Sequence, residues 1–60
     1  MGGLMKNNTN IISIYQQGNS FVGFNNEDEI VMRYSIADPV LKAKTVLQWT
    51  KEGRFKGLLA

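Results

Sequence analysis

The sequence predicts an α+β fold in which a three-stranded antiparallel β-meander is followed by one α-helix. Two observations indicate this order. Stretches rich in β-branched and aromatic residues, separated by short polar turns, fill residues 10–35. From Asp38 onward, apolar residues recur instead at the three- and four-residue spacing of a helix. Residues 54–60 are long enough to add a short fourth strand, parallel to one of the others, or to remain a frayed apolar tail.

The first two strands are expected to form a tight hairpin. The segment NIISIYQQ, residues 10–17, leads into Gly18 and Asn19, a two-residue turn signal that suits the twist of paired strands. With these two residues as the loop, Ile14 lies opposite Gly23. We expect Gly23 to mark a close approach that makes room for a bulky neighbour, such as a side chain of the helix.

A polar cluster, NNEDE at residues 25–29, separates the hairpin from the third strand, IVMRYS at residues 30–35. Its three adjacent carboxylates would diverge on a turn, and they lack the alternating ligands and central glycine of a calcium loop. The cluster is therefore predicted to be a solvated turn rather than a metal or catalytic site.

A helix is predicted over residues 39–52. Asp38 can cap its first N–H groups, Pro39 suits the first helical position, and Gly53 can end it in a left-handed conformation. Trp49 is expected to form a partly buried lid at the edge of the core. When each residue advances about 100°, four apolar residues fall within an arc of roughly 120° that should face the sheet: Val40, Ala43, Val46 and Leu47.

The composition excludes most catalytic and cofactor chemistry. The chain has 60 residues with no cysteine and no histidine, and no glycine-rich phosphate loop. We therefore expect a protein that is not an enzyme, with no catalytic residues, metal ligands, cofactors or small-molecule substrate. No stretch is apolar enough for a signal peptide or a membrane span, which predicts a cytoplasmic protein. Residues 1–9 are expected to be flexible, and residues 10–60 to form a single small domain.

One helix of about 14 residues covers only one face of a small sheet. We assign Ile12, Ile14, Phe21 and Gly23 to the covered face. Unless the C-terminal segment folds across it, the other face exposes an apolar patch that a monomer rarely leaves open. The chain is therefore predicted to be a small interaction or regulatory protein that binds a macromolecular partner, as a homodimer or with a protein target. The predicted interface is Ile11, Tyr15, Val22, Phe24 and Val31.

A second hypothesis rests on the distribution of charge. Residues 1–38 carry two cations against four acids, whereas residues 39–60 carry five cations against one acid. A basic helix and tail with an aromatic residue among the cations can follow a phosphate backbone and stack on bases. The alternative function is thus a nucleic-acid-binding protein, although the same cations could simply keep the helix solvated or meet an acidic protein. The residues concerned are Lys42, Lys44, Trp49, Lys51, Arg54 and Lys56.

Overall fold

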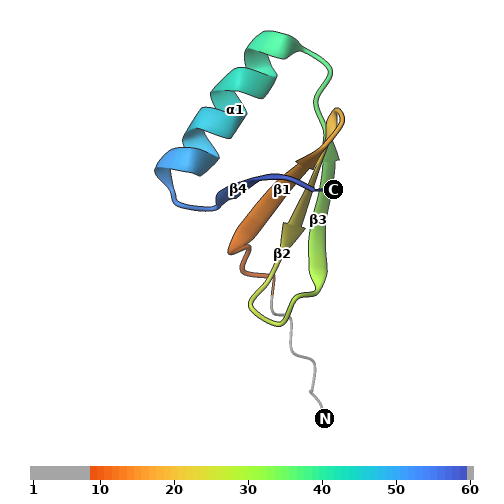
Figure 1. Cartoon of the computed structure of the whole chain (residues 1–60), viewed down its shortest axis with the longest axis vertical. Helices are drawn as coiled ribbons and strands as arrows, with labels where there is room; N and C mark the ends of the chain where they lie inside the picture. Colours follow the sequence, from red (N-terminus) through yellow and green to blue (C-terminus); the bar gives the residue numbers. More distant parts are fainter. Residues whose placement is uncertain (1–8, 60) are drawn as a thin grey trace.

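The computed structural model describes residues 9–59 and shows one helix on one side of a four-stranded mixed sheet (Figure 1). The first three strands are antiparallel, the last is parallel to β1, and their order in the sheet is β3-β2-β1-β4. The predicted α+β fold is confirmed, and the C-terminus forms the fourth strand. The segment 1–9, expected to be flexible, lies outside the described residues except for Thr9. The elements are β1 (Ser13–Gln17), β2 (Ser20–Phe24), β3 (Ile30–Ser35), α1 (Pro39–Lys51) and β4 (Phe55–Leu58).

The β1–β2 hairpin has the predicted register. Gly18 has a φ of 66°, and Asn19 is not among the residues with positive φ, which is the pattern of a type II′ turn. This turn matches the twist of the two strands and thereby fixes which residues share a face. The pairs are Ser13 with Phe24, Ile14 with Gly23, Tyr15 with Val22, Gln16 with Phe21, and Gln17 with Ser20.

The pairing of β2 with β3 contains a bulge. Gly23 pairs with Met32 and Phe24 pairs with Ile30, so Val31 is an extra residue in β3. A bulge of this kind bends an edge strand and increases its twist. Regular alternation of side chains between the two faces therefore begins only at Met32 in β3.

Gly23 does mark a close approach, but its bulky neighbours do not come from the helix. A Cβ at this position would lie 3.0 Å from Met32 Cβ and 3.1 Å from Ile11 Cγ2. Ile11 packs against the core cluster on the α1 side of the sheet, whereas Ile12 is 42% exposed. The prediction that Ile12 lies on the covered face and Ile11 on the other face was wrong, because β1 begins only at Ser13 and strand alternation does not extend to these two residues.

Both ends of α1 follow the predicted chemistry. Val40 N–H donates to Asp38 Oδ1 at 2.9 Å, and Pro39 follows the cap. At the other end Gly53 has a φ of 78°, its N–H donates to Thr50 O, and Arg54 N–H donates to Trp49 O, which is a Schellman motif. The motif reverses the chain after α1, so that β4 begins at once and pairs with β1 at the edge of the sheet.

The core is small and aromatic. Ile14, Phe21 and Ile36 are buried, and the Trp49 ring meets the Phe21 ring edge-on, with centroids 5.1 Å apart. Phe55, from β4, also packs edge-on against Phe21, with ring centroids 6.5 Å apart. Edge-on aromatic pairs add about 0.5–1.5 kcal/mol beyond the area that they bury. Trp49 is thus the partly buried lid that the sequence predicted.

The roll of α1 about its own axis differs from the prediction. Only Val46 of the predicted stripe packs against the core, together with Trp49, while Val40 is 62% and Leu47 is 55% exposed. The large indole ring removes more apolar surface from water than valine or alanine does, so the helix turns Trp49 toward the sheet. Most of the predicted stripe therefore faces sideways into solvent.

We predict that Gly23→Ala lowers the free energy of unfolding by about 1–3 kcal/mol, because the added methyl group overpacks Met32 and Ile11. Urea unfolding followed by Trp49 fluorescence measures the loss. In an Ile11→Ala background, where one of the two neighbours is removed, the same substitution should cost less. An equal cost in both backgrounds would contradict this packing.

Candidate functional site

The side of the sheet opposite α1 is called the open face. It carries Tyr15, Val22 and Phe24, since these residues alternate with the buried Ile14 and Phe21 along the paired strands. Val22 is only 2% exposed, so it does not offer the accessible surface expected of it. The Tyr15 and Phe24 rings pack edge-on with centroids 5.8 Å apart.

The predicted interface residues do not form one exposed patch. Tyr15, Phe24 and Val31 are half-buried, Val22 is buried, and Ile11 packs with the core on the α1 side. Leu59, after β4, covers part of the open face. Its N–H donates to Gln16 O at 2.8 Å, and its half-buried side chain lines the same hollow as Tyr15 and Phe24. The open face is therefore partly closed by the chain itself.

A small hollow of about 220 Å³ remains in the open face. It lies where β1, the end of β2 and the residue after β4 meet the β2–β3 turn. We call it the open-face hollow, and it is lined by Ser13, Tyr15, Phe24, Asp28 and Leu59.

The β2–β3 turn is built around Asn25, which is fully buried. Asn25 Oδ1 accepts hydrogen bonds from Glu27 N–H at 2.9 Å and Glu29 N–H at 3.0 Å, and its Nδ2 donates to Glu29 Oε1 at 2.9 Å. Asp28, which has a φ of 62°, donates its N–H to Asn25 O. The acidic turn is therefore held in a single shape by one buried amide.

A larger apolar groove runs beside α1. It has a volume of about 480 Å³ and takes one wall from the helix and the other from Gln16 on β1. Its lining includes Pro39, the first residue of α1, and three members of the stripe that was expected to face the sheet: Ala43, Val46 and Leu47. We call it the α1 groove, and it is lined by Gln16, Pro39, Lys42, Ala43, Val46, Leu47 and Thr50.

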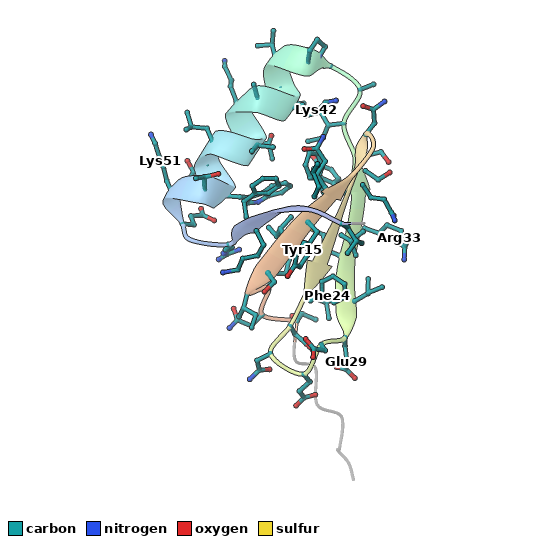
Figure 2. The ribbon with its side chains drawn as sticks, viewed as in Figure 1. Tyr15, Phe24, Glu29, Arg33, Lys42 and Lys51 are labelled. Atoms are coloured by element: carbon teal, nitrogen blue, oxygen red, sulfur yellow. The ribbon has the colours of Figure 1, made fainter. Side chains whose placement is uncertain are left out.

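The six residues of the nucleic-acid hypothesis do not share one face. Lys42 Nζ donates to Asn19 Oδ1 at 2.7 Å, toward the β1–β2 turn, whereas Lys51 points away from the sheet at the other end of α1 (Figure 2). Lys44 and Lys51 lie on the same side of α1 because they are seven residues apart. Trp49, which was to stack on bases, packs against Phe21 instead.

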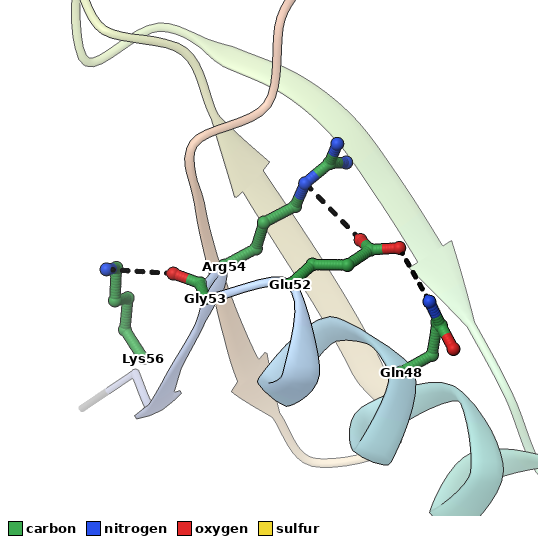
Figure 3. Close-up of polar contacts among 5 residues, drawn as sticks. All are labelled: Gln48, Glu52, Gly53, Arg54 and Lys56. Carbon is green, nitrogen blue, oxygen red and sulfur yellow. Dashed lines mark hydrogen bonds and ion pairs between the residues drawn. The ribbon is translucent and has the colours of Figure 1, made fainter.

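The remaining cations lie at the C-terminal end of α1 (Figure 3). Arg54 Nε is 3.4 Å from Glu52 Oε1, and Glu52 Oε2 accepts from Gln48 Nε2 at 2.8 Å. Lys56 Nζ donates to Gly53 O at 3.3 Å. These contacts are exposed and weak, so they position the side chains without adding much stability.

Sequence reasoning missed the residues that complete each cavity. Gln16 and Thr50 in the α1 groove are polar and carried no signal, whereas the apolar stripe beside them was noticed but assigned to the sheet. In the open-face hollow, the β2–β3 turn places Asp28 near Tyr15 and Phe24, and β4 places Leu59 there. Strand alternation in the sequence does not predict either position.

Within residues 9–59 no group of acidic side chains is arranged to hold a metal ion, and no helix there has the length and apolar character needed to cross a membrane. No protein-family model matches the chain, and neither the curated proteins nor the solved structures with which it was compared include a significant match.

We predict that Asn25→Ala destabilises the fold by about 2–3 kcal/mol, because two backbone N–H groups lose their acceptor in a partly buried site. Urea unfolding provides the measurement. Within residues 9–59 the exposed Asn19 side chain accepts a hydrogen bond only from Lys42, so Asn19→Ala is the matched control and should cost less than about 0.5 kcal/mol. Similar losses in both variants would show that Asn25 does not organise the turn.

The homodimer through the open face stays a prediction. If it forms, sedimentation equilibrium at increasing concentration will give twice the mass of 6.8 kDa, and Phe24→Lys will keep the chain monomeric by placing a charge in the interface. Circular dichroism of the variant checks that it is folded. A monomer at every concentration would rule out the dimer.

Proposed function

We propose that this protein is a small interaction module, without catalysis of its own, that binds an acidic amphipathic helix of a partner protein in the α1 groove. The exposed apolar flank of α1 carries the proposal. Val40 and Leu47 are more than half exposed, and no residue of α1 is buried. A helix normally buries its most apolar stripe, and an uncovered stripe next to a groove is typical of a surface that meets a partner.

The dimensions suit a helix. α1 has 13 residues, so it is about 20 Å long and offers a wall for three to four turns of a second helix. Apolar side chains at every third or fourth position of the partner would lie on Ala43, Val46 and Leu47. Such helix-in-groove binding uses few anchor residues and needs no large interface.

The charges around the groove select an acidic partner. Lys42 lines it, held by its hydrogen bond to Asn19, and Lys44 and Lys51 follow the solvent side of the same stripe. The two carboxylates at the ends of α1 are already engaged. Asp38 caps the helix, and Glu52 contacts Gln48 and Arg54. An apolar floor with a basic rim complements an amphipathic helix that carries Asp or Glu beside its apolar positions.

The same charges disfavour a second copy of this chain as the occupant of the α1 groove. Pairing two α1 stripes would bring Lys44 and Lys51 of both copies together, and within residues 9–59 no carboxylate lines the groove to offset them. These lysines lie on the other side of the sheet from the open face, so they do not oppose a dimer through that face.

A display library of helical peptides tests the proposal. Selected peptides should repeat apolar residues at helical spacing and be enriched in Asp and Glu beside them. Leu47→Lys should weaken a selected peptide by about tenfold or more, since one buried leucine contributes about 1.5–3 kcal/mol. The matched control is Leu41→Lys, an equally exposed position outside the groove, which should change affinity by less than about twofold.

Three outcomes would overturn the proposal: no helical peptide is enriched, the selected flanks are neutral or basic, or the two leucine variants weaken binding equally. The nucleic-acid function stays a prediction. Leu47→Lys and Leu41→Lys distinguish it from the binding of a partner helix. An added lysine should maintain or strengthen binding of a labelled oligonucleotide, whereas it should weaken binding of an apolar helix.

A further inference from the structure

The open-face hollow lies on the opposite side of the sheet from the α1 groove and has different chemistry. At about 220 Å³ it is smaller than the pockets that enclose drug-sized ligands, and it suits the end of one side chain or a small amine. Its lining residues carry two aromatic rings, one carboxylate, two hydroxyl groups (of Ser13 and Tyr15) and one leucine side chain.

The aromatic walls come from adjacent strands. The Tyr15 and Phe24 rings pack edge to face with an interplanar angle of 84°, and both residues line the hollow. The face of an aromatic ring carries a negative potential and attracts a cation, most strongly where water is displaced. Leu59 adds an apolar surface for the carbons attached to that cation.

The carboxylate comes from Asp28, whose backbone is held in a left-handed conformation by the turn around Asn25. Within residues 9–59, the Asp28 carboxylate has no hydrogen bond or ion pair, although its own N–H is bonded to Asn25 O. Arg33 pairs with Val22 in the β2–β3 register and does not line the hollow. The charge of Asp28 is therefore available to a ligand.

From this placement we infer that the open-face hollow binds an organic ammonium group. The rings receive the cation, Asp28 balances its charge, and Ser13 offers an oxygen acceptor to any N–H of a primary amine. The ammonium group belongs either to a free small amine or to a lysine side chain, methylated or not. This site is independent of the α1 groove and of the helix that we propose to bind there.

The first test is an NMR titration of the full chain with choline and with its neutral isostere, 3,3-dimethyl-1-butanol. The two probes have the same shape and differ only in charge. Choline should shift the ring resonances of Tyr15 and Phe24 and the methyl resonances of Leu59, and it should bind at least about threefold more tightly than the alcohol. Equal binding of both probes, or shifts spread over the molecule, would overturn the inference.

Asp28→Asn supplies the second test, because asparagine also tolerates a positive φ and the variant should keep the turn. The variant should weaken choline binding about threefold or more, whereas Glu27→Gln, which removes the same charge from a neighbouring residue outside the hollow, should leave it within about twofold. Equal effects would mean that only the general negative charge of the turn attracts the probe.

A third arm identifies the source of the ammonium group. Short peptides with a central lysine or trimethyllysine are compared with choline in the same titration. Tighter binding of a peptide assigns the site to a protein side chain, whereas tighter binding of choline assigns it to a free amine. If none of the three probes binds, the inference is overturned. Leu47→Lys should bind choline with the same affinity as the unaltered chain, which would show that the α1 groove is not involved.

Discussion

The packing of Trp49 on Phe21 is the contact on which the rest of the structure depends. Phe21 is buried in β2, Trp49 reaches it from α1, and Phe55 reaches it from β4. A chain of 60 residues buries only about 60% of its unfolded surface, so a few aromatic side chains account for a large share of the available burial. The hairpin is thus joined at one ring to the C-terminal helix and strand, which are distant from it in the sequence.

This contact also determines what the molecule exposes. Because the indole ring takes the position on the sheet, the stripe of Val40, Ala43 and Leu47 turns aside and lines or borders the α1 groove. On the other side of the sheet, the edge-on pair of Tyr15 and Phe24 shields Val22 and leaves a hollow instead of a flat apolar face. The two cavities have opposite electrostatic character, since lysines border one and a carboxylate lines the other.

Features set by neighbouring residues could be predicted from the sequence, whereas features set by distant contacts could not. The turn at Gly18 determines the hairpin register, and Asp38 and Gly53 determine where α1 begins and ends. The roll of α1 depends on which side chain fills the space over Phe21, and a helical wheel does not contain that information. The bulge at Val31 and the cover from Leu59 likewise arise from strand pairing that leaves no local signal.

Proton NOE measurements test the orientation of α1. We expect cross-peaks from the Trp49 indole protons to the rings of Phe21 and Phe55, and none from the methyl groups of Val40 to any sheet residue. Cross-peaks from the Val40 and Leu47 methyl groups to Ile14, with the Trp49 indole exposed to solvent, would contradict it. In that case the stripe would face the sheet after all, and the α1 groove would not exist.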